Sequence, residues 1–329
     1  MKARPYWLNL LVVAVLLGTS LFAVVAAPAA AQESESAMLA ALITERLADW
    51  TPVITADALY ENLTDGDDSN DPLIVSVRSP EDYAKGHIPG AYNIPWKTIA
   101  DDANLAKLPT DKPIVVYCYT GHTGQVAATV LRVLGYDVQN LKYGMMGWTD
   151  DMDVLATKPF EGPAGYPVET EPNELTETYA APVLETGMAD AVEIAKARAQ
   201  AMLPDWTPFV AADALYETLT DGEDSNDPFI LSVRSAEDYA KGHVPGAYNV
   251  PWKNVAVDLT KYPTDKPIVT YCYTGHTGQV GAVSLALLGY DVTNLKYGMM
   301  GWTDDPEVLA QPAFAGPAGY PVETEANEM

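Results

Sequence analysis

Residues 117–126 read YCYTGHTGQV, and residues 271–280 repeat the same ten letters. The only two cysteines of the chain, Cys118 and Cys272, occupy the same place in the two copies. An apolar run precedes each cysteine, and a Gly-rich turn and a helix-like stretch follow it. This order aims loop amides and a helix N-terminus at one sulfur atom, which favours the nucleophilic thiolate. The pattern predicts two reactive cysteines; the alternative is a pair of buried, inert ones.

The duplication extends well beyond the cysteine loops. Matching segments lie at 77–97 and 233–253, at 110–115 and 264–269, at 140–151 and 294–305, and at 162–171 and 316–325. A period this long indicates a duplicated domain rather than a solenoid. The second copy is shorter between Trp252 and Thr264, which predicts a surface loop at that point.

We therefore predict a domain at 38–157 and a second domain at 190–311. Residues 158–187 are rich in Pro, Gly, Glu and Thr, which is typical of a linker. Residues 312–329 form a C-terminal tail. The segment GPAGYPVETE occurs in both the linker and the tail, and we expect each copy of it to pack onto its own domain.

Strand-like and helix-like segments alternate within each copy. In the first copy we expect strands at 73–77, 92–95, 114–117 and 137–141, and helices after Ser79 and at 123–134. Alternation with short connections predicts an α/β domain, with a central, mostly parallel sheet flanked by helices. Such folds place their sites outside the carboxyl ends of central strands, where both cysteines are expected.

The N-terminus resembles a targeting segment. Lys2 and Arg4 precede an apolar run that ends in small residues at Ala31, which describes a secretory signal peptide at 1–31. We expect export to the periplasm or the extracellular space; the alternative is an uncleaved segment that anchors the chain in a membrane. The formal net charge of −26 argues against nucleic acid as a partner, because binding it requires a basic face.

Two cysteines in an exported protein also invite a disulfide. They are 154 residues apart at equivalent points of two repeats, so a disulfide would require the two loops to meet, and we expect two free thiols instead. The chain contains no CxxC or HExxH motif, so we expect no metal, and we expect no cofactor.

Four histidines and two arginines accompany the loops. His122 and its counterpart in the second copy could help an anionic substrate to bind or stabilise the thiolate, or could simply face solvent; both interpretations remain open. For His87 we prefer a structural role in the turn between a helix and a strand over a Cys–His pair. Arg78 is expected to pair with Glu81 or Asp82. Trp148 and Trp302 are expected in the core or supporting a loop.

Together these segments resemble the tandem rhodanese-domain proteins of the sulfurtransferase family. The resemblance rests on VRSPEDYAKGHIPGAYNIP at 77–95, CYTGHTG at 118–124 and NLKYGMMGW at 140–148, each of which recurs in the second copy. It implies two rhodanese-like α/β domains. It also implies that Cys118 and Cys272 form persulfides, taking sulfane sulfur from a thiosulfate-type or polysulfide-type donor and passing it to cyanide or a thiol.

The resemblance further implies a cradle of loop amides around each persulfide. The residues of the two cradles are Tyr119, Thr120, Gly121, His122 and Thr123, and Tyr273, Thr274, Gly275, His276 and Thr277. A thiolate suits this chemistry because attack on sulfur needs a good nucleophile and a stabilised persulfide anion. The alternative function is a persulfide carrier or sulfur-binding module without catalysis.

Three features depart from the pattern of the family. Ser76 and Ser232 stand where many members have Asp, which removes an expected partner of the following arginine. The loop also lacks the Arg or Lys that would hold a sulfonate, which argues against thiosulfate as the natural donor. Finally, both cysteines are retained, so we predict two working sites, and the near-identical copies predict domains packed as a pseudo-dimer.

Phosphatases and arsenate reductases of related fold need Arg six residues after the cysteine. Gly124 and Gly278 occupy that position, so we do not expect these activities.

Overall fold

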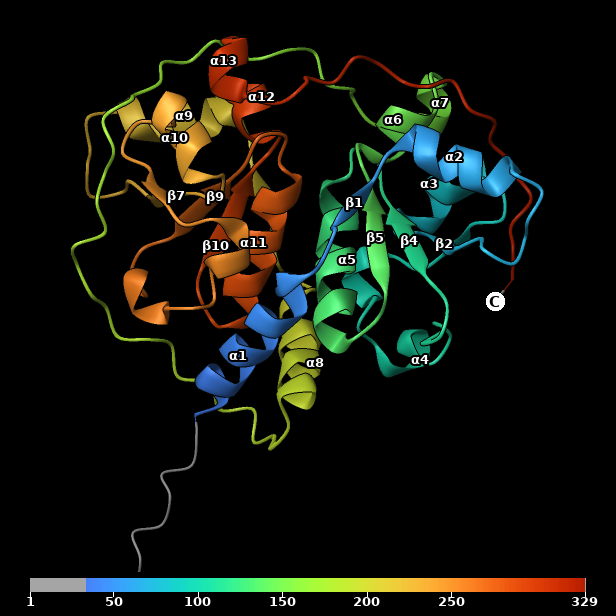
Figure 1. Cartoon of the computed structure of the whole chain (residues 1–329), viewed down its shortest axis with the longest axis horizontal. Coiled ribbons are helices and arrows are strands. Elements are labelled where there is room, and N and C mark those ends of the chain that lie inside the picture. Colours follow the sequence, from blue (N-terminus) through green and yellow to red (C-terminus); the bar gives the residue numbers. More distant parts are fainter. Residues whose placement is uncertain (1–33, 329) are drawn as a thin grey trace, which may run out of the picture. The chain divides into compact units, whose positions relative to one another are not determined.

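The computed structural model describes residues 34–328, and the predicted signal peptide at 1–31 lies outside them. The two copies form matching series of helices and strands (Figure 1). The first copy contains α1 (Glu35–Ala48), β1 (Val53–Ile54), α2 (Ala56–Thr64), β2 (Leu73–Ser76), α3 (Pro80–Lys85), β3 (Tyr92–Asn93), the 3-10 helix η1 (Trp96–Thr98), α4 (Asp102–Leu105), β4 (Ile114–Tyr117), α5 (His122–Leu134), β5 (Val138–Leu141), α6 (Gly144–Trp148) and α7 (Met152–Leu155). The second contains α8 (Ala191–Met202), β6 (Phe209–Val210), α9 (Ala212–Thr220), β7 (Phe229–Ser232), α10 (Ala236–Lys241), β8 (Tyr248–Asn249), η2 (Trp252–Asn254), η3 (Leu259–Lys261), β9 (Ile268–Tyr271), α11 (His276–Leu287), β10 (Val292–Leu295), α12 (Gly298–Trp302) and α13 (Pro306–Leu309).

Each copy is built on a sheet of five parallel strands. The strand orders are β1-β5-β4-β2-β3 and β6-β10-β9-β7-β8, so β4 and β9, the strands before the cysteines, are central. All four residues of β4 are buried, because helices cover both faces of the sheet. Ile114 and Val116 join the core that contains α5, whereas Val115 and Tyr117 join the core on the opposite face. The predicted α/β fold, with a central parallel sheet flanked by helices in each copy, is confirmed.

Local sequence signals explain where the helices begin and end. Ser79 caps α3, since its hydroxyl accepts a hydrogen bond from the Asp82 N–H, and Pro80 opens the helix. Gly135 ends α5 in a left-handed conformation with φ 102°. Between Trp252 and Thr264 the second copy is two residues shorter than the first, and it has the short η3 in place of α4.

The two GPAGYPVETE segments, at 162–171 and 316–325, do not pack onto their own domains as expected. We call them the straps. In the first strap the N–H groups of Ala164 and Tyr166 donate to carbonyls of α12 in the second copy, at 3.0 and 2.9 Å. In the second strap Ala318 and Tyr320 donate to Gly147 and Trp148 of α6 in the first copy, at 3.0 and 2.9 Å. Each copy is therefore covered by the strap that belongs to the other.

Each strap can attach to either copy, because its backbone groups form no regular structure and need hydrogen-bond partners elsewhere. Their own domain and the other copy offer the same carbonyls, so the sequence does not distinguish them. The indole N–H groups of Trp148 and Trp302 complete the attachment by donating to Pro321 and Pro167 at 2.8 Å. Both tryptophans are buried, as predicted.

Reciprocal contacts also join the two copies directly. Helix α1 contacts α8, and α5 contacts α11. The ammonium of Lys97 donates to the Pro204 carbonyl at 2.7 Å, and that of Lys253 donates to the Ala48 carbonyl at 2.6 Å. Across residues 34–328, no helix combines the length and the apolar character needed to cross a bilayer.

Candidate active site

Cys118 and Cys272 lie at the carboxyl ends of the central strands, directly before the loops that lead into α5 and α11. Both are free thiols, and each residue has 1% of its surface exposed. Gly121 and Gly275, which precede the two helices, adopt left-handed φ values of 86° and 88°. A Cβ atom at Gly121 would collide with the ring of His276. The loop curls tightly after the cysteine, as its glycines predict.

The loop amides are free to bind an anion. In the described part of the chain, no protein group accepts a hydrogen bond from the backbone N–H groups of residues 119–123 or 273–277. The loop carbonyls are held instead: Met145 N–H donates to Cys118 O at 2.9 Å, and Asn140 Nδ2 donates to Gly121 O at 2.9 Å. Buried N–H groups rarely lack partners, and a row of them before a helix forms an anion-binding nest.

The glycine six residues after each cysteine is tightly packed. A Cβ atom at Gly124 would collide with the side-chain oxygen of Asn140, and one at Gly278 would collide with that of Asn294. An arginine at this position would therefore displace the asparagine that holds the loop. The packing therefore leaves no room at this position for the arginine that phosphatases need.

The loop histidines face the other copy rather than solvent. Nε2 of His122 accepts a hydrogen bond from Tyr297 N–H at 3.0 Å, and Nε2 of His276 accepts one from Tyr143 N–H at 3.1 Å. Because a backbone N–H only donates, a neutral ring carries its proton on Nδ1, which lies 2.9 Å from Thr120 Oγ1 in the first copy. The solvent-facing interpretation is wrong, since both rings are buried.

Burial keeps both rings neutral. It lowers the pKa of His122 well below its ordinary value, and the nearby His276 and Lys296 lower it further. Burial, together with Lys142, lowers the pKa of His276 to about 3. Neutral rings whose two nitrogens are already engaged hold the two copies together. They do not supply a positive charge to a substrate.

A cavity of about 200 Å³ opens beside Cys272. Its lining includes five of the predicted site residues and four others, in full Cys272, Tyr273, Thr274, His276, Thr277, Val53, Lys142, Trp252 and Gln311. Lys142 and Val53 belong to the first copy, so the site of the second copy contains residues from both. Lys142 and Lys296 were not predicted as site residues, although both lie in the repeated NLKYGMMGW segment. Their repetition was the available signal.

Arg78 does not pair with Glu81 or Asp82, so that prediction is wrong. Its guanidinium is buried and donates to the carbonyls of Val154 and Gly86. The Asp82 carboxylate instead accepts from Lys85 and from the Tyr119 hydroxyl, each at 2.6 Å. Two backbone carbonyls thus hold the guanidinium, and its Nε lies 3.4 Å from the Ser76 hydroxyl.

His87 has the structural role that we preferred. Its buried ring stacks on Tyr83 with centroids 3.8 Å apart, and Nδ1 lies 3.0 Å from the Tyr83 carbonyl. Its Nε2 lies 3.3 Å from a carboxylate oxygen of Glu323 in the second strap. The ring therefore supports the turn after α3 and contacts the strap.

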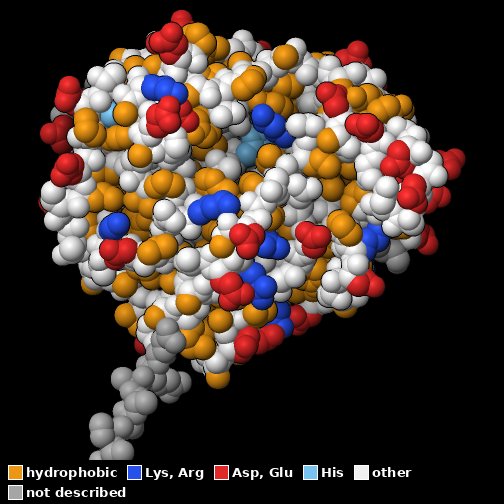
Figure 2. Space-filling model, in the orientation of Figure 1, with side chains coloured by type: hydrophobic (Ala, Val, Ile, Leu, Met, Phe, Trp, Pro, Cys, Tyr) orange, Lys and Arg blue, Asp and Glu red, His pale blue; other side chains and the backbone are white. Residues whose placement is uncertain are grey.

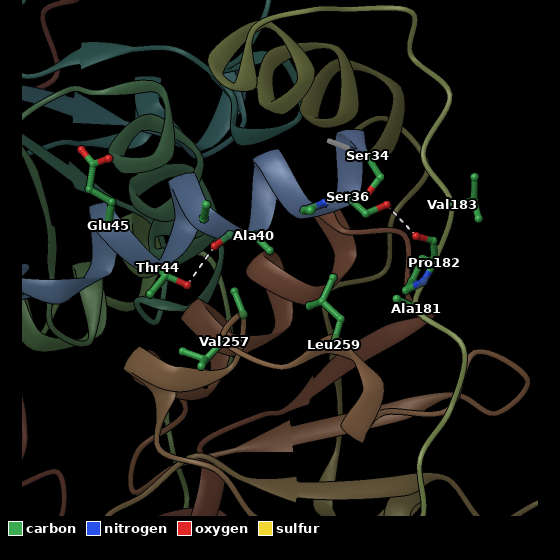
Figure 3. Close-up of a pocket in the computed structure, with 13 residues that line it drawn as sticks. Ser34, Ser36, Ala40, Thr44, Glu45, Ala181, Pro182, Val183, Val257 and Leu259 are labelled. Carbon is green, nitrogen blue, oxygen red and sulfur yellow. Dashed lines mark hydrogen bonds between the residues drawn. The ribbon is translucent and has the colours of Figure 1, made fainter. Parts of the chain in front are cut away.

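A larger cavity of about 780 Å³ lies away from both cysteines (Figure 3). It is lined mainly by short side chains of α1, by residues 181–183 and by the segment around Val257. Ser36 spans part of it, donating to the Pro182 carbonyl at 2.5 Å. No cysteine or histidine lines this cavity, so it lacks the nucleophile that the cysteine loops supply. Within residues 34–328, no three His, Cys, Asp or Glu side chains gather as metal ligands would.

The model of the rhodanese-like domain family matches the chain twice, over residues 55–151 and 211–305. The chain belongs to the rhodanese family. Both matched ranges fall inside the predicted domains, whose outer limits stay predictions. The two cysteine loops are thus the rhodanese loops of two tandem domains.

Three similar proteins each match a part of this rhodanese about as long as one domain. A sulfurtransferase of Allochromatium vinosum is 32% identical over 96 residues, which are 29% of this chain and 85% of that protein. A thiosulfate sulfurtransferase of Pseudomonas fluorescens is 35% identical over 96 residues, which are 29% of this chain and 81% of that protein. A solved rhodanese-like domain protein from Staphylococcus aureus is 32% identical, with a TM-score of 0.27, and the match covers 29% of this chain and 88% of that one.

Other relatives are longer proteins that match this chain over 20% to 33% of their length. Family membership and the sulfurtransferase relatives support sulfur transfer in general as the chemistry of this rhodanese.

Proposed function

We propose that the chain is an exported sulfurtransferase in which Cys118 and Cys272 each carry a sulfane sulfur as a persulfide. The observation that supports this most directly is a buried cysteine at the end of a central strand, next to loop amides without protein partners. A persulfide bears its negative charge on the outer sulfur, which the amides would stabilise. The free thiols leave both sulfur atoms available.

The transfer has two steps. The cysteine thiolate attacks the outer sulfur of a donor such as thiosulfate; the new S–S bond forms as the old one breaks, and sulfite leaves with the electron pair. An acceptor, cyanide or a thiolate, then attacks the outer sulfur of the persulfide. The cysteine leaves as thiolate, so the enzyme returns to its starting state without a net redox change.

Intact-protein and peptide mass spectrometry tests the proposal. After treatment with thiosulfate or an inorganic polysulfide, the peptides of Cys118 and Cys272 should each gain the mass of one sulfur atom, and cyanide should remove it. Cys118→Ser and Cys272→Ser should each retain loading at the remaining cysteine. Wild-type protein without an adduct on either cysteine would end the proposal, and one variant without any activity would end the prediction of two sites.

A persulfide carrier without catalysis is the second candidate. The net charge of −26 favours it, because a strongly acidic protein repels anionic donors. A carrier would load one sulfur per cysteine and release little of it with repeated additions of cyanide or thiol. Steady-state formation of thiocyanate distinguishes the two, since only an enzyme turns over many times.

Export and domain packing belong to the same proposal. Cleavage after Ala31 would release the mature chain, and N-terminal sequencing of the protein recovered from a secreting host would detect it. A mature chain that still begins at Met1 and sediments with membranes would indicate the anchor instead. We also propose that the two domains pack as a pseudo-dimer, which the reciprocal His122–Tyr297 and His276–Tyr143 hydrogen bonds support.

A further inference from the structure

The turn after β5 and the turn after β10 each reach the cysteine loop of the other copy. Tyr143, which follows Lys142 in the turn after β5, donates its N–H to His276 in the loop of Cys272. Tyr297, which follows Lys296, donates in the same way to His122 in the loop of Cys118. Each lysine is therefore attached, through its neighbour, to the loop of the opposite cysteine.

Lys142 lines the cavity beside Cys272. Burial lowers the pKa of this lysine, and the nearby Cys272 thiolate opposes that shift. Lys296 has the same balance between burial and the Cys118 thiolate. The pairing is thus crossed at both sites: each cysteine has a lysine of the other copy as its neighbouring cation.

Neither lysine has a carboxylate partner. Among residues 34–328, no Asp or Glu oxygen lies within 4.0 Å of either ammonium, and each lysine is half-buried beside an aromatic ring. Lys85 and Lys241, by contrast, each lie 2.6 Å from an aspartate. Lys142 and Lys296 thus each keep a half-buried ammonium that no acidic side chain neutralises, in a chain with 45 acidic and 19 basic residues. Acidic side chains are scattered over the face in Figure 2. A partly buried charge without a counter-ion is unfavourable, so the position favours binding of an anion.

We propose that Lys142 binds the anionic donor at Cys272 and that Lys296 does so at Cys118, so that each repeat supplies the cation missing from the loop of the other. This rests on the proposed sulfurtransferase function and specifies its donor class as a small anion with a sulfane sulfur, such as thiosulfate. The loop amides hold the transferred sulfur, and the ammonium faces the leaving sulfite group, whose charge increases as the S–S bond breaks.

The test compares how fast each cysteine is loaded, site by site. Lys142→Met and Lys296→Met are made in the full mature chain and treated with thiosulfate or with an uncharged organic trisulfide. With thiosulfate, quenched peptides report the persulfide at each cysteine. With the trisulfide, the thiolate attacks an outer sulfur and the remaining half leaves as a perthiolate, so the peptides report a mixed disulfide. Lys142→Met should slow thiosulfate loading of Cys272 by about 10- to 100-fold, the range expected for one charged hydrogen bond, and Lys296→Met should do so at Cys118. Formation of the mixed disulfide from the trisulfide should change little at either cysteine.

Two further variants control for charge and for folding. Lys112→Met removes one exposed positive charge just before β4, at the end of that strand opposite to Cys118. It should leave the thiosulfate rates at both cysteines near wild type. Lys142→Arg retains the charge and should recover most of the thiosulfate rate at Cys272.

Three outcomes would overturn the inference. These are unchanged thiosulfate loading in Lys142→Met, slowing at Cys118 in the same repeat instead of at Cys272, and equal slowing with both donors. All three leave the sulfurtransferase proposal standing if wild-type protein is loaded. Wild-type protein that forms no persulfide with either thiosulfate or an inorganic polysulfide would instead refute the proposed function itself.

Discussion

The buried histidines predict a loss of stability as the pH falls. The pKa of His276 is about 3 in the folded chain because its ring is buried, against an ordinary value of 6.5. The unfolded chain therefore binds a proton below about pH 6.5 that the folded chain refuses until about pH 3. The stabilisation is complete above this window and is lost on acidification through it. At about pH 5 the loss from this one ring is about 2 kcal/mol, since each unit below 6.5 corresponds to about 1.4 kcal/mol.

His276→Gln isolates this contribution. Its side-chain oxygen can accept the Tyr143 N–H as Nε2 does, but glutamine does not titrate. Urea unfolding of wild type and variant, at about pH 7 and at about pH 5, gives the free energy of unfolding of each. The many carboxylates titrate alike in both proteins, so they cancel in the comparison. The variant should lose about 2 kcal/mol less than wild type over this range.

An equal loss in the two proteins would refute the reasoning, because the ring would then not be held neutral by burial. His122→Gln should change the pH dependence in the same direction, since burial also lowers the pKa of that ring. A wild-type protein whose stability does not change over the range would contradict the assignment for both histidines.

Three further predictions concern packing. Phe209, the first residue of β6, lies beside His122 and Lys296, whereas its counterpart Val53 in β1 lines the cavity beside Cys272. Phe209→Val replaces the ring with a smaller side chain and should speed persulfide formation at Cys118. Site-resolved mass spectrometry that shows no change would contradict this. Deletion of 312–329 removes the second strap, and hydrogen exchange should accelerate in α2 and α6 of the first copy while α9 and α12 stay protected. Acceleration in the second copy instead would show that the straps are not crossed. Gly124→Ala forces a methyl group against Asn140 and should lower the free energy of unfolding by about 1–3 kcal/mol; a denaturant midpoint like that of wild type would show that the loop adapts.

Much of the site was predictable because its signals are local. The strand before Cys118, the tight turn at Gly121 and the helix after it follow one another within a few residues, and all three are present as predicted, with the helix beginning one residue earlier, at His122. The cap at Ser79 and the end of α5 at Gly135 are local in the same sense. Nearest neighbours determine such features, so sequence patterns identify them directly.

The partner of Arg78 was not predictable in this way. Two acids stand close to it in the sequence, yet the side chain turns inward and donates to the carbonyls of Val154 and Gly86. Val154 is 76 residues away along the chain. Only the packing of α7 against α3 brings this carbonyl to the guanidinium.

The sequence by itself determined two α/β domains and two rhodanese loops. It also places a glycine six residues after each cysteine, where phosphatases need an arginine. Only the tertiary structure decided which of the two copies each repeated group contacts. The straps, the loop histidines and Lys142 all contact the other copy, although each copy carries the same residues in the same order. A duplicated sequence offers every donor and acceptor twice, so the path of the chain in space determines which of two identical partners is used.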